Sequence, residues 1–337
     1  MIARSAGTVC SVSAVRTTSP SRLIKLVRGG VNDVLGRGPV FAPQPLGRHI
    51  DPSDVRGYYC DMRHKAQQHT RHPDYWLEYV IPTAQTALGY WELMLDGGDT
   101  REPFLDRAES LVRQARPGPG GRGVAWYTDR PLTKYDLAPG WISAMGQGEA
   151  ISVLLRAHSL TGNERYLGLA NEAFEPFDLD VAEGGVQRCI DGHVVLEEYA
   201  TAKPAAILNG WIFALFGVHE LATTTGHERA RRLFDQTFDG LVSLLPRYDV
   251  GWWSRYSLYD HGRPDLAKPF YQRLHPVLLT AVDMIRPNPA LRIMADRWRR
   301  QLNRRGVARL LVDKLAFRLH WERNVVDGAA ATFNPTG

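Results

Sequence analysis

Four short connections of similar character recur along the chain, and each separates two stretches with helical periodicity. They are residues 96–100, 161–163, 225–227 and 286–289 of a 337-residue sequence. Successive connections lie roughly 64 residues apart, a length that accommodates two helices of ordinary size with their linking loops. The chain is therefore predicted to be a series of helical hairpins.

Within each predicted hairpin the first helix is the more apolar. The predicted first helices are 81–95, 144–160, 205–221 and 277–285, and the second helices run through 104–108, 165–170, 231–234 and 291–295. A ring with apolar helices inside and amphipathic helices outside buries these faces economically. We therefore expect a mainly α fold, an (α/α) toroid or barrel of about four helical hairpins. Strand-like segments at 124–127, 185–188, 193–196 and 252–256 predict short β-hairpins at the mouth of its cleft.

The domain organisation follows from where this pattern begins and ends. Residues 1–46 are expected to form a basic, poorly ordered N-terminal extension, with no acidic residue before Asp33. Residues 47–305 are expected to form the α/α-barrel domain that carries the candidate site, and residues 306–337 a C-terminal tail.

Composition restricts the function classes. The chain is 44% hydrophobic and 23% charged, with no apolar run long enough to cross a bilayer, so we expect a soluble, cytoplasmic protein. Its net charge of +5 favours an anionic partner. The arginines are spread out and no nucleic-acid recognition motif accompanies them, and an acidic polysaccharide or a sugar acid fits this charge equally well. The partner that we expect is an acidic polysaccharide or another uronate-containing glycan, and not nucleic acid. A homodimer stays open.

Neither a metal nor a cofactor is predicted. Cys10, Cys60 and Cys189 are widely spaced and form no CxxC pair, which argues against a disulfide framework and a thiolate metal site. The sequence also contains no Walker loop, no HExxH motif and no glycine fingerprint for nucleotide binding.

Polar and aromatic residues gather at the ends of the predicted inner helices, where they are expected to meet at one cleft. They are Trp126, Gln147, Glu198, Tyr199, Asn209, Tyr256, Tyr271 and His275. Such a mixture suits a carbohydrate, because rings stack on sugar faces while hydroxyls take hydrogen bonds. Trp211 and Trp298 are expected in the core instead. Neighbours on an extended segment point to opposite faces, so only one of Glu197 and Glu198, and one of Trp252 and Trp253, should face the cleft or solvent.

The polar segments together resemble the C-terminal catalytic domain of the glucuronyl C5-epimerases of heparan-type polysaccharides. The matching text is PGWISAMGQGEAIS at 139–152, Glu197-Glu198-Tyr199 with Pro204, Leu208-Asn209-Gly210-Trp211, LPRYDVG at 245–251 leading to Tyr256, and Tyr271 with His275. Order and spacing agree over roughly residues 120–300.

This resemblance implies cofactor-free inversion at C5 of glucuronate to give iduronate, as in heparan sulfate biosynthesis. A base on one sugar face removes the C5 proton and an acid on the other face returns one. By position, Glu198, Tyr256 and Tyr271 match the family's catalytic residues. Tyr199, Gln147, Asn209, Arg255, His275 and Trp126 are the expected substrate-binding residues. A tyrosine base needs nearby positive charge, for which the candidates are Arg255, Lys203, Arg188 and Arg273.

The sequence departs from the family pattern at several positions. After Tyr256 the family has an acidic residue, leucine, arginine and histidine, whereas this chain has Ser257-Leu258-Tyr259-Asp260. Gln272 replaces a usual histidine and Ala200 a usual proline. The arginine expected to hold the substrate carboxylate is therefore absent, and Arg255 or Arg263 could substitute.

Two other functions stay open beside the epimerase. A polysaccharide lyase of the same toroid type needs the same C5 base, and a hydrolase needs a second acid, for which Asp249 and Asp260 are candidates. A non-catalytic glycan-binding protein would keep the aromatic residues without turnover.

Overall fold

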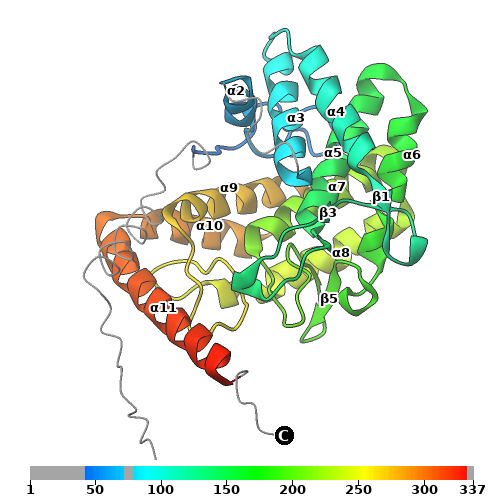
Figure 1. The fold of residues 1–337 in the computed structure, drawn as a ribbon. Helices are drawn as coiled ribbons and strands as arrows, with labels where there is room; N and C mark the ends of the chain where they lie inside the picture. Colours follow the sequence, from blue (N-terminus) through cyan, green and yellow to red (C-terminus); the bar gives the residue numbers. More distant parts are fainter. Residues whose placement is uncertain (1–41, 72–78, 332–337) are drawn as a thin grey trace, which may run out of the picture.

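The computed structural model describes residues 42–71 and 79–331, in which eight helices form four hairpins (Figure 1). The inner helices are α3 (Val80–Leu95), α5 (Ala144–Thr161), α7 (Leu208–Thr225) and α9 (Pro269–Ile285). The outer helices are α4 (Arg101–Gln114), α6 (Glu164–Glu172), α8 (Glu228–Leu244) and α10 (Pro289–Gln301). Each inner helix packs on its own outer helix, and the inner helices contact one another in the order α3, α5, α7, α9. The predicted mainly helical fold of four α/α hairpins is confirmed.

Glycines at the predicted connections end two of the inner helices. Gly162 and Gly226 follow α5 and α7 with φ of 67° and 69°, a left-handed conformation that favours glycine. Asn163 and His227 then cap the outer helices, since their side chains accept hydrogen bonds from the backbone amides of Arg165 and Ala230. The recurring connections are thus the turns of the hairpins.

Small residues allow α5 and α7 to lie unusually close together. A β-carbon at Gly148 would stand 2.7 Å from the Cα of Ala214, and one at Gly217 would overlap the carbonyl of Gly148. The starts of these two helices border the site described below.

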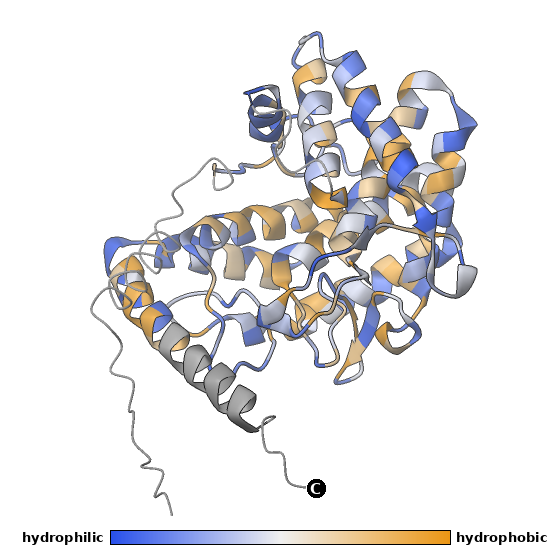
Figure 2. Ribbon diagram, viewed as in Figure 1, coloured by the Kyte–Doolittle hydropathy of each residue, from blue (hydrophilic) through white to orange (hydrophobic). Residues whose placement is uncertain are grey.

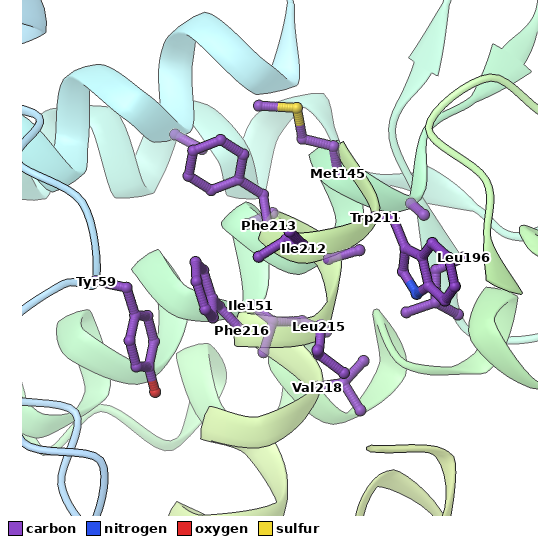
Figure 3. Close-up of a cluster of buried hydrophobic side chains, with 14 of the residues drawn as sticks. Tyr59, Met145, Ile151, Leu196, Trp211, Ile212, Phe213, Leu215, Phe216 and Val218 are labelled. Atoms are coloured by element: carbon purple, nitrogen blue, oxygen red, sulfur yellow. The ribbon is translucent and has the colours of Figure 1, made fainter. Parts of the chain in front are cut away.

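The core lies between the inner helices and the outer layer. Figure 3 shows its central part, where Phe213 and Phe216 of α7 meet Tyr59 and Ile151. The Tyr59 and Phe216 rings stack with centroids 4.1 Å apart. Apolar residues are concentrated on α7 and α9, whereas the peripheral α2 (Arg63–Arg71) is hydrophilic (Figure 2). Trp211 and Trp298 are fully buried, as predicted.

Three two-stranded antiparallel sheets occur among the described residues, two of them before α5 and one before α7. Their pairs are β1 (Arg116–Pro117) with β2 (Val124–Ala125), β3 (Tyr127–Thr128) with β4 (Trp141–Ile142), and β5 (Gln187–Ile190) with β6 (His193–Leu196). The prediction of a strand at 252–256 is wrong. Only isolated bridges form there, from Ser254 to Asp249 and from Arg255 to Leu266. Trp253 of this segment is buried while Trp252 is partly exposed, so the predicted alternation holds.

Two inner helices begin elsewhere than predicted. Helix α9 begins eight residues before the predicted start at Val277, because the internal Pro276 does not end it and Pro269 occupies its first turn. Helix α7 begins at Leu208 rather than at residue 205, since Ala206 has a φ of 41° that cannot continue into a helix. Tyr271 and His275 therefore lie on α9 and not ahead of it.

Further elements frame the hairpins. Helix α2 packs against α3, and α11 (Arg304–Ala331) runs through much of the segment expected to be a C-terminal tail. Most of the predicted N-terminal extension, residues 1–41, lies outside the described residues, whereas Leu46 pairs with Cys60 and Gln44 is buried. Short 3-10 helices occur at Pro119–Gly121, Thr133–Tyr135, Glu175–Asp178, Val181–Glu183 and Leu245–Tyr248. Within the described ranges, no helix is both long and apolar enough to span a membrane.

Candidate active site

A pocket of about 570 Å³ opens between α3 and α9, at the starts of α5 and α7. This volume is typical of sites for small organic ligands and sugar residues. Its polar and aromatic lining includes Lys65, Gln85, Arg130, Trp141, Glu198, Tyr199, Asn209 and Tyr271. Residues from elements far apart in the sequence thus meet at one place, as the sequence analysis expected.

The two adjacent glutamates point in opposite directions, which confirms the prediction from their spacing. Both Glu197 carboxylate oxygens accept backbone hydrogen bonds, from Ala205 at 3.0 Å and Ala206 at 2.7 Å. Arg188 lies 3.1 Å from the same carboxylate. Glu197 therefore holds the loop between β6 and α7 closed. Glu198 is left on the other face, where it lines the pocket.

Glu198 lies directly against the first turn of α7. A β-carbon at Gly210 would overlap the Glu198 side chain, so only glycine leaves room for it there. The Asn209 amide nitrogen is 3.5 Å from a Glu198 carboxylate oxygen, at the limit of a hydrogen bond. The positive end of the α7 dipole favours a negative charge at this position.

Burial nonetheless dominates the ionisation of Glu198. It raises the pKa of this carboxyl to about 7, with a hydrogen bond to Tyr199 acting in the opposite direction and the charge of Glu197 adding to the rise. A carboxyl with a pKa near 7 populates both protonation states at neutral pH, which is what a group that exchanges protons with a substrate needs.

Three tyrosines surround this carboxyl. The rings of Tyr256 and Tyr271 have centroids 4.6 Å apart, and the hydroxyls of Tyr199 and Tyr256 are 3.5 Å apart. Burial first, and then the charge of Glu198, raises the pKa of each phenol above its ordinary value. All three phenols are therefore protonated at neutral pH and can act as proton donors. Tyr199 and Tyr271 line the pocket, and Tyr256 lies behind them.

The buried Asp265 positions the backbone of Tyr256. The backbone amide of Tyr256 donates to the Asp265 carbonyl at 2.6 Å. The Asp265 carboxylate is 2.7 Å from the Lys134 ammonium and 3.3 Å from that of Lys314 on α11. These two lysines help to hold the pKa of Asp265 well below its usual range, against the effect of burial. The loop that carries Tyr256 is thus tied to both the 133–135 turn and the C-terminal helix.

The departures from the family pattern have local partners. The Ser257 hydroxyl donates to Asp265 at 3.3 Å, and the Tyr259 hydroxyl donates to Asp136 at 3.0 Å. Gln272 accepts from the Ser254 amide at 2.9 Å and donates to the Trp298 carbonyl at 3.1 Å. Ser257, Tyr259 and Gln272 therefore each have a structural connection of their own.

Four of the predicted substrate-binding residues lie away from the pocket. The Trp126 indole is in the core and donates to the Leu111 carbonyl, while Gln147 holds the Trp126 backbone amide at 3.0 Å. His275 is fully buried against Trp298 and bonds the Ser254 hydroxyl at 3.0 Å. The Arg255 guanidinium donates to the Ser257 carbonyl at 3.1 Å. Of these four residues only Gln147 lies in the first turn of an inner helix, and the sequence does not show which face each side chain takes.

The cations proposed to assist tyrosine are also elsewhere. Lys203 and Arg273 are exposed, and Arg188 is paired with Glu197. The Lys134 ammonium lies 5.5 Å from the centre of the Tyr256 ring.

Sequence reasoning missed several pocket residues. Lys65, Gln85 and Arg130 come from segments without a recognisable motif, so only the fold brings them to the site. Trp141, whose ring meets that of Tyr199 edge-on at 5.6 Å, stands inside the family-like segment 139–152, and that position was an available signal. No cluster of three or more metal-ligating side chains occurs among the residues described.

Comparison with known proteins connects this site to one family. The sequence model of the D-glucuronyl C5-epimerase C-terminus matches residues 122–300, which is more than half of the chain. The D-glucuronyl C5-epimerase of Caenorhabditis elegans is 33% identical over 210 residues, covering 58% of this chain and 34% of that protein. An uncharacterised protein of Methanocaldococcus jannaschii is 30% identical over 156 residues, covering 45% of this chain and 49% of its own length.

Among solved structures, the cellobiose 2-epimerase of Spirochaeta thermophila is 12% identical with a TM-score of 0.49, covering 84% of this chain and 86% of that one. The chain spans only a third to a half of the length of the two curated relatives, 34% and 49%. The matched region 122–300 carries Glu198, Tyr199, Asn209, Tyr256 and Tyr271. The chain belongs to the family of the D-glucuronyl C5-epimerase C-terminus.

Proposed function

We propose that this protein inverts C5 of a D-glucuronate residue in an acidic, heparosan-like polysaccharide, giving L-iduronate. The observation that carries the proposal is the placement of Glu198 beside Tyr199 and Tyr271 on the wall of one pocket. A carboxyl that exchanges protons near neutrality and phenols that stay protonated are the two kinds of group that this reaction needs.

Inversion requires a proton acceptor on one face of the sugar ring and a donor on the other. With a pKa near 7, Glu198 can accept the C5 proton once ionised. Tyr271 keeps its proton, because burial raises its pKa, and it can deliver that proton to the opposite face. In the reverse direction the two groups exchange roles.

Tyr256 and Tyr199 extend this pair. Their hydroxyls are 3.5 Å apart, and the Tyr256 ring contacts that of Tyr271. Because neighbouring hydroxyls in a low-dielectric site polarise one another, this group can redistribute a proton between turnovers. Tyr256 therefore supports the donor from behind, while Asp265 holds its backbone.

The lining favours proton transfer over glycoside hydrolysis. Glu198 is the only acidic side chain among the described residues that line the pocket. Of the candidates for a second acid, Asp249 pairs with Arg297 at 2.8 Å and Asp260 is exposed. A hydrolase of the usual kind needs two carboxyl groups flanking the scissile bond, and no described residue supplies the second.

Incubation with an unsulfated glucuronate polymer in deuterated water tests the proposal. We expect NMR to show deuterium at C5 together with iduronate. Tyr271→Phe should lose the iduronate signal and keep deuterium exchange at C5 of glucuronate, because Glu198 remains, whereas Glu198→Gln should lose both signals. An unsaturated uronate would instead establish a lyase, which uses the same base but expels the C4 substituent. Binding without exchange would leave a glycan-binding protein, and either result would contradict the proposed epimerisation.

A further inference from the structure

Lys65 is a pocket-lining cation that the family comparison does not account for. It belongs to α2, which precedes the matched region 122–300. Its side chain is half-buried and reaches the pocket wall. Within the ranges that the structure covers, its ammonium has no ion pair and no hydrogen bond to another side chain, and Glu149 is the carboxyl that interacts with it electrostatically. A cation held by surrounding protein without such a partner is costly, unless a ligand supplies the opposite charge.

We infer that Lys65 binds the carboxylate of the uronate residue whose C5 is inverted, an inference that rests on the proposed function. It assigns the substrate-recognition cation of this site to a helix outside the family match. It also identifies the ligand group by chemical class, as a sugar carboxylate attached to the reacting carbon.

Glu149, the carboxyl that interacts electrostatically with Lys65, does not neutralise the charge of its ammonium. Glu149 is fully buried, accepts a hydrogen bond from the Gln85 amide at 3.0 Å, and has a second oxygen without a partner. Burial raises the pKa of Glu149 to about 8, so this carboxyl is mostly protonated at neutral pH. Burial likewise lowers the pKa of Lys65, as expected for a cation whose counter-charge is incomplete.

The position of Lys65 suits a carboxylate on the reacting carbon. Lys65 and Glu198 both line this one pocket, so a sugar bound there can meet both groups. The uronate carboxylate is bonded directly to C5. A group that binds this carboxylate must therefore stand close to the residues that transfer the C5 proton. As the proton leaves, negative charge spreads onto the carboxylate oxygens, and a fixed cation stabilises it most in the transition state.

The other pocket cations fit this role less well. The Arg130 guanidinium lies over the Tyr79 ring, 4.9 Å from its centre. His69 bonds the Tyr90 hydroxyl at 2.8 Å, and burial lowers its pKa, so it is neutral at physiological pH. Tyr259 occupies the place where the family pattern has its arginine, and Arg255 donates to a backbone carbonyl instead. Lys65 is thus the favoured partner for the carboxylate.

A binding comparison tests the inference independently of turnover. The probes are a glucuronate-containing hexasaccharide and its carboxyl-reduced counterpart, each titrated by calorimetry into wild type, Lys65→Met, Lys65→Arg and Lys203→Met. A hydrogen-bonded charge contributes enough that wild type should prefer the carboxylate form by about 10- to 100-fold. Lys65→Met should bind both probes nearly equally, whereas Lys65→Arg should keep most of the preference. Lys203→Met is the matched control, since Lys203 is exposed, and it should behave as wild type.

The inference would be overturned if Lys65→Met still bound the carboxylate probe more tightly than the carboxyl-reduced one. It would also be overturned if Arg130→Met alone lost this preference. Equal binding of the two probes by wild type would overturn it too. Circular dichroism checks the fold of each variant, and Lys65→Gln is the second neutral variant if Lys65→Met does not fold. A preference that depends on Lys65 without any C5 exchange would contradict only the proposed function. Normal exchange with the preference intact in Lys65→Met would contradict only the inference.

Discussion

Replacing Glu198 by glutamine should change how the stability of this protein depends on pH. Burial raises the pKa of the Glu198 carboxyl from its ordinary value of 4.5 to about 7. A group whose pKa is higher in the folded state favours folding below its unfolded pKa, and this contribution is lost as pH rises through the folded pKa. The wild-type protein should therefore lose stability, relative to Glu198→Gln, as pH rises from about 4.5 to about 7.

The size of this effect follows from the two pKa values. One pKa unit corresponds to about 1.4 kcal/mol, so the whole difference is about 3 kcal/mol. Part of it falls below pH 5, which leaves about 2.5 kcal/mol between pH 5 and pH 8. Glu149 and Glu197 also have raised pKa values, but they are present in both proteins and largely cancel in the comparison.

Urea unfolding of both proteins at pH 5 and pH 8 measures this difference directly. Glu102→Gln is the matched control, because the Glu102 side chain is 84% exposed and its removal should leave the pH dependence unchanged. If the free energies of unfolding of wild type and Glu198→Gln change by the same amount between pH 5 and pH 8, folding does not raise the pKa of Glu198 and the reasoning fails.

Three further substitutions test other parts of the structure. In Gly210→Ala the new methyl group overlaps the Glu198 side chain, so turnover should fall about 100-fold while the circular dichroism spectrum stays unchanged. Normal turnover would contradict this expectation, because it would show that Glu198 can move aside. In Asp265→Asn the carboxylate between Lys134 and Lys314 is lost, and the free energy of unfolding in urea should fall by about 3 kcal/mol; an unchanged midpoint would contradict this. In Arg156→Met the fully buried Glu220 carboxylate loses a partner at 2.7 Å, which should cost about 3–5 kcal/mol of stability, and adding Glu220→Leu should recover part of it.

The fold could be predicted from the sequence because its main signals are local and repeated. Apolar periodicity located the inner helices, and Gly162 and Gly226 took the left-handed conformations that end α5 and α7. The errors have local causes as well. The helix predicted over 277–285 begins too late, because α9 continues through Pro276, and the positive φ of Ala206 delays the start of α7.

The candidate site was predictable only where neighbouring residues constrain one another. The alternation at Glu197 and Glu198 assigned one carboxyl to the loop and the other to the pocket. Side-chain direction at Trp126, Gln147 and His275 depends on tertiary packing, which the sequence does not display. Lys65 reaches the pocket only because α2 packs against α3, so no sequence motif marks it.

Release of label from C5, measured separately from each epimer, tests the central claim most directly. Polymers carrying tritium at C5 of glucuronate, or at C5 of iduronate, would be given to wild type, Glu198→Gln and Tyr271→Phe. We predict that wild type releases tritium from both polymers, whereas each variant loses release from one epimer, with the two variants failing on opposite ones. Undiminished release in both variants, or loss from the same epimer in both, would contradict proton transfer by Glu198 and Tyr271 on opposite faces of the sugar.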